Sequence, residues 1–358
     1  MVKNPVNRLS VNTLAMMTVA AVVSLRGLPM MAKEGTEMFF YIGFCTVLFL
    51  LPGSLVSAEL GGAFSHTKGG VYSWVKEAFG PRWGFVAIWL QWIQNVVWHP
   101  TVLAFAAAAL AYLFLDPGLA ELGWYNAAVI LVVYWTATLL TLRGVSVQAA
   151  ATKWLLIGGT ILPGILVMGF ALVWVIQGNA VEFLAAGNTS GVAADGYVHP
   201  RFFPHITGLS DMAFLAGIIL LFAGVEVQAV HARELSDPPR QYPAAMFLAM
   251  LIIFGLFTLG ALAVAAVVPA EQISLTAGLM QAFQTFLQRF GIADAIPAVG
   301  LLVAFGAIGG VMAWIGGPSR GLLETAQEGE LPPFLAHTNT HGVQINILVI
   351  QGVIVTAL

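Results

Sequence analysis

Two ionisable residues lie within long apolar runs of this 358-residue sequence, and each stands beside residues that disturb a helix. Arg26 lies in "VVSLRGLPMM", where a glycine and a proline follow it. Glu226 lies in "LLFAGVEVQAV", two positions after a glycine. A charge at membrane depth costs several kcal/mol unless it faces a cavity or a partner. Both residues therefore indicate a polar cavity inside an apolar structure.

Each charge has two chemical interpretations, and the sequence leaves both open. The planar guanidinium of Arg26 suits the carboxylate of an anionic substrate. Alternatively, it pairs with a carboxylate such as Glu226 or extends to the outer membrane surface. Glu226 in a low-dielectric cavity could carry a proton, or it could bind the amides of a broken helix.

Helix-breaking residues beside both charges predict two unwound steps. Glycine and proline destabilise a helix by about 1 and about 3 kcal/mol relative to alanine. Gly27 with Pro29, and Gly224, therefore favour unwinding near residues 23–27 and 222–226. Paired interruptions in corresponding spans are typical of a transporter binding site. The alternative is ordinary helix packing, because membrane helices are rich in glycine and this chain has 38.

Membrane-spanning helices are the elements that must hold these residues. Hydrophobic residues make up 59% of the chain and charged residues only 9%, against about 25% charged in soluble domains. About 20 apolar residues cross a bilayer. We predict an all-α polytopic membrane protein with the lipid bilayer as its surroundings. The expected spans are 10–31, 38–62, 83–113, 124–142, 149–176, 211–232, 242–268, 295–317 and a ninth, cut short, from Val343 to Leu358.

The spacing of the interruptions predicts an internal repeat within one transmembrane domain, residues 1–358. The first and sixth spans would open two five-helix repeats of inverted topology, 1–176 and an incomplete 177–358. Lys and Arg are enriched on the cytoplasmic side of membrane proteins, and ten of the fourteen lie on the side of the N-terminus, which we expect in the cytoplasm. These ten are Lys3, Arg8, Lys68, Lys76, Arg82, Arg143, Lys153, Arg233, Arg240 and Arg320.

Three stretches resemble one group of transporters. The region of residues 56–94, which contains "GGVYSWVKEAFGPRWGF", resembles the second-to-third span region of the amino acid-polyamine-organocation superfamily. "GPSRG" with "TAQEGELP", between residues 317 and 332, and "GVEVQAVHARELSDPPRQYP", residues 224–243, are similar to the bacterial glutamate/GABA antiporter group within it. The resemblance implies a leucine-transporter-type fold with 5+5 inverted repeats. Such transporters usually have twelve spans, and we expect this sequence to be truncated within the ninth.

The resemblance also implies which residues contact an amino acid substrate. The first interruption departs from the G-S-G pattern common in relatives. The aromatic gate of arginine/agmatine exchangers falls on Leu220, which disfavours a guanidinium substrate because it forms no cation-π contact. Ordinary membrane packing is the alternative for the two tryptophans among these residues. With Arg26 added from its position, the expected substrate-binding residues are Val22, Val23, Ser24, Arg26, Asn95, Trp98, Ala223, Gly224, Glu226 and Trp314.

The surroundings of Trp314 favour a position on the cavity. Gly309, Gly310, Ala313 and Gly317 form a stripe of small residues along which a neighbouring helix can pack. Trp314 lies beside this stripe, so we expect its ring to point inward. A buried indole N–H needs a polar partner, and the predicted cavity is the nearest source of one.

Coupling to sodium is not expected. Sodium sites of this fold use Ser or Thr hydroxyls of the eighth span, yet "LLVAFGAIGGVMAWIGG" contains none before Ser319. Lys153 in the fifth span could occupy that space as a fixed cation, or it could extend to the membrane interface.

Other classes of function lack their motifs. No H-E-x-x-H, G-x-S-x-G or P-loop is present, so we predict no enzyme, no cofactor and no metal. A net charge of -3 without a basic tract indicates no nucleic acid partner. We predict a multi-pass protein of a bacterial inner membrane that exchanges a small acidic or zwitterionic amino acid, as glutamate and GABA are, by alternating access. A cationic amino acid or polyamine exchanger, a uniporter and a non-transporting sensor are the alternatives; the oligomeric state is open.

Overall fold

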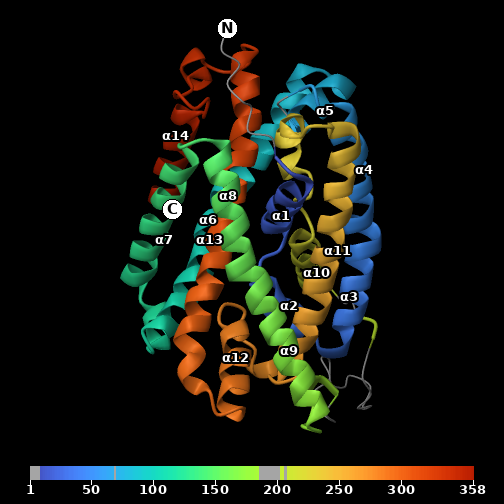
Figure 1. The fold of residues 1–358 in the computed structure, drawn as a ribbon, viewed down its shortest axis with the longest axis vertical. Coiled ribbons are helices and arrows are strands. Elements are labelled where there is room, and N and C mark those ends of the chain that lie inside the picture. Colours follow the sequence, from blue (N-terminus) through green and yellow to red (C-terminus); the bar gives the residue numbers. More distant parts are fainter. Residues whose placement is uncertain (1–8, 68–69, 185–201, 205–207) are drawn as a thin grey trace.

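The computed structural model describes residues 9–67, 70–184, 202–204 and 208–358, and these residues form helices and loops without a strand. Most helices run along one long axis (Figure 1). Helix α5 (Val71–Phe79) lies at one end of that axis, and α12 (Gly278–Arg289) lies at the other. Lys3, Arg8 and Lys68, which contribute to the predicted orientation, are outside the described residues.

The first predicted span is interrupted, as expected. Helix α1 (Val11–Val22) begins at Ser10, whose side chain accepts a hydrogen bond from the amide of Thr13, and α2 (Gly27–Ala32) resumes after residues 23–26. Gly27 and Pro29 therefore begin the second half instead of forming the unwound step. Proline is tolerated in the first turn of a helix, where its missing N–H has no partner to lose.

The sixth predicted span is also interrupted. Helix α10 (Leu209–Leu221) ends before residues 222–226, and the chain continues as a 3-10 helix, η6 (Val227–Glu234). Gly224 within the break has a φ of +111°, which favours glycine. Both expected interruptions are confirmed, and the 3-10 geometry after the second one was not predicted.

Helix occurs in each of the nine segments predicted from hydropathy. Within the described residues, six stretches are long and apolar enough to cross a membrane. They are η1 (Gly35–Glu37) with α3 (Met38–Cys45), η2 (Thr46–Leu50) and α4 (Leu51–Ala63); α6 (Pro81–Leu113); α7 (Gly123–Thr141); α8 (Val145–Leu156) with η4 (Ile157–Ile161) and α9 (Leu162–Ile176); α11 (Pro238–Ala265); and η8 (Ala293–Ala295) with α13 (Ile296–Gln327). Helix α14 (Ile345–Ala357) and α1 are shorter and apolar. The connections hold η3 (Pro117–Glu121), η5 (Glu182–Leu184), η7 (Ala270–Gln272) and η9 (Pro333–Ala336).

Helix α13 forms the centre of the bundle, packed against α6, α8, α1 and η6. Glycine permits the closest of these contacts. A Cβ at Gly306 would lie 2.2 Å from the carbonyl oxygen of Gly159, and one at Gly300 would lie 2.5 Å from that of Ala109. At its C-terminal end, α13 is joined to α5 because Tyr72 and Lys76 both contact the carboxylate of Glu328.

Candidate functional site

A cavity of about 250 Å³ lies where the two interrupted helices meet α6 and α13. The structure brings nine of the ten expected substrate-binding residues to its wall. These are Val22, Ser24, Arg26, Asn95, Trp98, Ala223, Gly224, Glu226 and Trp314. Met30, Gln94, Gly217 and Leu221 also line it, together with Leu220. The tenth residue, Val23, lines a smaller neighbouring cavity.

Arg26 and Glu226 share this cavity without forming an ion pair with each other. Arg26 immediately precedes α2, and its guanidinium has no hydrogen bond or ion pair with any described residue. Glu226 Oε1 accepts a hydrogen bond of 3.0 Å from Gln91 Nε2. The structure therefore does not show the pairing of Arg26 with Glu226 that the sequence left open. A cation and an anion facing one small cavity suit a ligand that carries both charges.

Gln91 is a site residue that the sequence argument missed. It belongs to α6 and lies four positions before Asn95, so the two side chains share one face of that helix. This spacing is the signal that could have identified it. Gln94 and Met30 also line the cavity and were not predicted.

Trp314 connects both interruptions. Its Nε1 donates a hydrogen bond of 2.6 Å to the carbonyl oxygen of Ala21, in the last turn of α1. Its ring covers Gly224, where an added Cβ would lie 2.8 Å from Trp314 Cζ2. The ring of Trp98 lies 5.7 Å away between centroids. The polar partner expected for the indole is thus a carbonyl at the first break.

Asn95 contributes a free acceptor to the same wall. Its Nδ2 donates a hydrogen bond of 2.9 Å to the carbonyl oxygen of Trp314. That carbonyl has no N–H four residues later, because the residue there is Pro318. The Oδ1 atom of Asn95 is buried and has no partner among the described residues. Buried polar atoms are normally hydrogen-bonded, so Oδ1 is available to a ligand donor.

A smaller cavity lies between the first break, α6, η4 and α13. Its eighth-span residues are Val303, Gly306, Ala307 and Gly310, which carry no hydroxyl, as the sequence indicated. Ser24 and Thr160 face it instead, and the hydroxyl of Thr160 from the fifth span was not anticipated.

Lys153 does not line either of these two cavities. Its Nζ lies 5.7 Å from the ring centroid of Trp154, whose exposed fraction is 68%. This contact favours the membrane interface over the position of a fixed cation at the eighth span. The described residues also hold no group of three or more His, Cys, Asp or Glu that could bind a metal ion.

Comparison with known proteins finds a matching permease family and similar transporters. The amino acid permease family profile matches residues 9–358. An uncharacterized transporter of Legionella pneumophila is 38% identical over 353 residues, which cover 98% of this chain and 72% of that transporter. A glutamate/gamma-aminobutyrate antiporter of Lactococcus lactis is 33% identical over 348 residues, 95% of this chain and 66% of the antiporter.

A more distant relative has a different named substrate. A probable agmatine/putrescine antiporter of Lactococcus lactis is 25% identical over 329 residues, 91% of this chain and 66% of that protein. The chain thus spans about two thirds of the length of these antiporters.

Proposed function

This chain belongs to the amino acid permease family, and we propose that it is an antiporter that exchanges small acidic or zwitterionic amino acids. The observation that carries the proposal is the presence of Arg26 and Glu226, not paired with each other, in one cavity between two interrupted helices. Binding sites at paired breaks are a recurring feature of transporters that work by alternating access. The antiporter of Lactococcus lactis named for glutamate and gamma-aminobutyrate supports this substrate class.

The charges suggest how such a substrate is oriented. A carboxylate of the substrate binds the guanidinium of Arg26, which has five N–H donors and no competing partner among the described residues. The ammonium group of the substrate lies toward Glu226 and the free Oδ1 of Asn95. Backbone groups of residues 23–26 and 222–226 complete the site where they are not already bonded within the chain, as the amides of Val23, Phe222 and Ala223 are.

We further propose exchange without sodium in a membrane where the N-terminus is cytoplasmic. The absence of hydroxyls at Val303, Gly306, Ala307 and Gly310 supports sodium independence. The distribution of Lys and Arg supports the orientation. In this scheme, residues 1–176 form the first five-helix repeat and residues 177–358 belong to the second.

A cationic amino acid or polyamine is the second candidate substrate, because one observation favours it. Glu226 faces the cavity together with Trp98 and Trp314, and a carboxylate with aromatic rings attracts an organic cation. The relative named as a probable agmatine/putrescine antiporter fits this alternative.

The test is a competition panel with the full-length protein in proteoliposomes. Unlabelled glutamate, GABA, agmatine and putrescine compete against labelled glutamate, with and without sodium. We expect Arg26→Gln to weaken competition by carboxylates, and Glu226→Gln to weaken competition by amines. Lys33→Gln, which removes an exposed cation beyond α2, is the matched control. Uptake that requires a sodium gradient and no internal substrate would contradict the proposal. Binding of substrate without any uptake would favour the alternative of a non-transporting sensor.

A further inference from the structure

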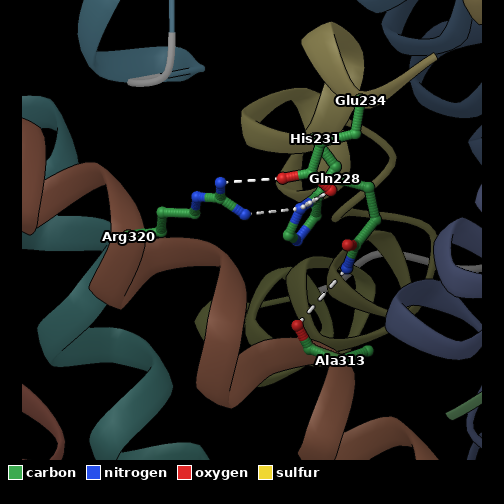
Figure 2. A network of polar contacts seen from close by, with 5 residues as sticks. All are labelled: Gln228, His231, Glu234, Ala313 and Arg320. Atoms are coloured by element: carbon green, nitrogen blue, oxygen red, sulfur yellow. Dashed lines mark hydrogen bonds and ion pairs between the residues drawn. The ribbon is translucent and has the colours of Figure 1, made fainter. Parts of the chain in front are cut away.

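One row of side chains joins the sixth span to the eighth on the side of the cavity where η6 continues the chain (Figure 2). In a 3-10 helix, residues three positions apart point in the same direction. Gln228, His231 and Glu234 have this spacing on η6. All three reach toward α13, so the geometry of η6 aligns them for contact with one neighbouring helix.

The contacts along this row are short and converge mainly on Arg320. Arg320 Nη2 lies 2.7 Å from Glu234 Oε1, and Nη1 lies 3.0 Å from His231 Nδ1. One turn deeper, Gln228 Nε2 donates a hydrogen bond of 3.3 Å to the carbonyl oxygen of Ala313. Ala313 precedes the cavity residue Trp314, so the row begins beside the cavity and continues away from it along η6 to Glu234.

His231 lies within hydrogen-bond distance of a partner on each of two helices, Arg320 on α13 and Glu234 on η6. Its Nδ1 lies 3.0 Å from Arg320 and also 3.2 Å from Glu234 Oε2. One nitrogen cannot accept from the first and donate to the second at the same time. With its proton on Nε2, His231 accepts from Arg320 and joins α13. With the proton on Nδ1, it bonds only within η6.

Burial makes the Arg320–Glu234 pair costly to break. The side chains are 19% and 13% exposed, whereas those of the nearby pair Arg240–Asp237 are 89% and 49% exposed at a distance of 3.9 Å. Removing one partner of a buried pair leaves the other charge uncompensated, but exposed pairs contribute little. Burial by itself would raise the pKa of Glu234, yet His231 and Arg320 outweigh that effect and lower it to about 2.

The row is also tied to the first span. The amide of Leu9, just before α1, donates a hydrogen bond of 2.8 Å to the carbonyl oxygen of Glu234. The segment before α1 is therefore bonded to the end of η6. On the far side of the breaks, the cavity wall includes Arg26, Met30 and Leu220, and Leu220 is 51% exposed. The contacts between η6 and α13 therefore lie on one side of the breaks, and these cavity residues lie on the other.

We propose that Gln228, His231 and Glu234, held by Arg320 and the Ala313 carbonyl, form a lock that closes the cavity on the side of the N-terminus and must open in each transport cycle. The proposal rests on the proposed function only for the alternating exposure of the cavity. It adds the specific contacts that separate, namely those between η6 and α13.

Accessibility of a cysteine tests the lock without any need for transport. Cys45 is the single cysteine and is buried, so the full-length protein with Cys45→Ala accepts one reporter. Val227 is 2% exposed and packs against Gly317 at the junction of η6 and α13. In the Val227→Cys protein, a membrane-impermeant thiol reagent applied from the N-terminal side measures how often this junction opens.

Loss of either charge should open the junction. We expect Glu234→Gln and Arg320→Gln to raise the labelling rate about tenfold or more, because each strands the remaining charge. The exchanged pair Glu234→Arg with Arg320→Glu should return the rate toward that of the parent. Asp237→Asn removes the exposed pair three residues away and is the matched control, for which no change is expected.

Two results with the charge variants would overturn the lock. One is labelling of the single-charge variants at the parent rate; the other is an exchanged pair that folds, by its melting temperature in detergent, but labels as fast as the single variants. Should the charge variants fail to fold, Gln228→Met removes one hydrogen bond at similar volume, and an unchanged labelling rate in it likewise contradicts the lock. If the charge variants change the labelling rate as expected but the parent protein exchanges no amino acid, the proposed function is refuted and the lock is not.

Discussion

The substitution Gly224→Ala tests the contact between the two interrupted helices. Gly224 has a φ of +111°, and non-glycine residues in sparsely populated backbone regions are strained by about 1 to 3 kcal/mol. The added Cβ would also lie 2.8 Å from Trp314 Cζ2. The ring has little freedom to retreat, because its Nε1 is hydrogen-bonded to Ala21 at 2.6 Å. Overpacking of this kind costs about 1 to 3 kcal/mol.

Together these effects are on the order of 3 kcal/mol, or about a hundredfold in an equilibrium constant, since about 1.4 kcal/mol corresponds to tenfold. We therefore expect exchange of labelled glutamate in proteoliposomes, at equal amounts of protein, to fall by about two orders of magnitude. The measurement is paired with the melting temperature in detergent, which separates a displaced cavity wall from general unfolding.

Gly255→Ala is the matched control for this substitution. Gly255 lies in α11, where an added Cβ would meet no atom within 4 Å, so exchange should be unchanged. If Gly224→Ala exchanged glutamate at the parent rate, the packing of Trp314 over the sixth-span break would not contribute to transport. If both variants lost activity equally, the loss would reflect glycine replacement in general and not this contact.

Three further results are expected. Trp314→Phe keeps an aromatic ring but removes the donor to the Ala21 carbonyl, and an unpaired buried acceptor costs about 1 to 3 kcal/mol. The exchange rate should therefore fall about tenfold in Trp314→Phe and further in Trp314→Leu. Exchange at the parent rate in both variants would show that Trp314 is not part of the site. Gly61→Ala places a Cβ 2.3 Å from the Tyr242 ring, so the melting temperature in detergent should drop clearly, and an unchanged value would contradict this packing. Glu234 has a pKa of about 2 against an ordinary value of 4.5, so its charged form contributes stability, of about 3 kcal/mol, above pH 4.5, which is lost as the pH falls toward 2. The difference in stability between the parent and Glu234→Gln should accordingly be present at pH 5 and decrease as the pH is lowered toward 2, and a difference that does not change between pH 5 and pH 3 would show that Glu234 is not held in this way.

The positions of the helices and of their interruptions follow from local chemistry. Apolar runs of sufficient length predicted helix in nine segments, and each contains helix. Glycine next to a charge predicted the break at residues 222–226, because the preference of Gly224 for a positive φ depends only on its own backbone. The position of Gly27 was less well predicted. It begins α2, since a helix can resume at a glycine when the proline that follows stands in its first turn.

The composition of the cavity wall was largely visible in the sequence, because charges and polar groups in apolar segments must face a common interior. Arg26, Asn95 and Glu226 are such groups, and the structure gathers them around one cavity. Gln91 escaped notice because it is one of several polar residues on α6, and only its distance to Glu226 distinguishes it.

Only the tertiary structure decided which polar groups are partners. Trp314 requires an acceptor, but that acceptor, Ala21, is 293 residues away along the chain. In the sequence, Arg320 does not differ from the other cations expected on the cytoplasmic side. Its contact with His231 and Glu234 depends on the 3-10 turn of η6 and on the close approach of α13 that glycine permits. Periodicity and residue preference act within one segment, whereas the crossing and rotation of two helices result from side-chain packing across the whole bundle. Partners between helices are therefore decided only when the complete set of helices is packed.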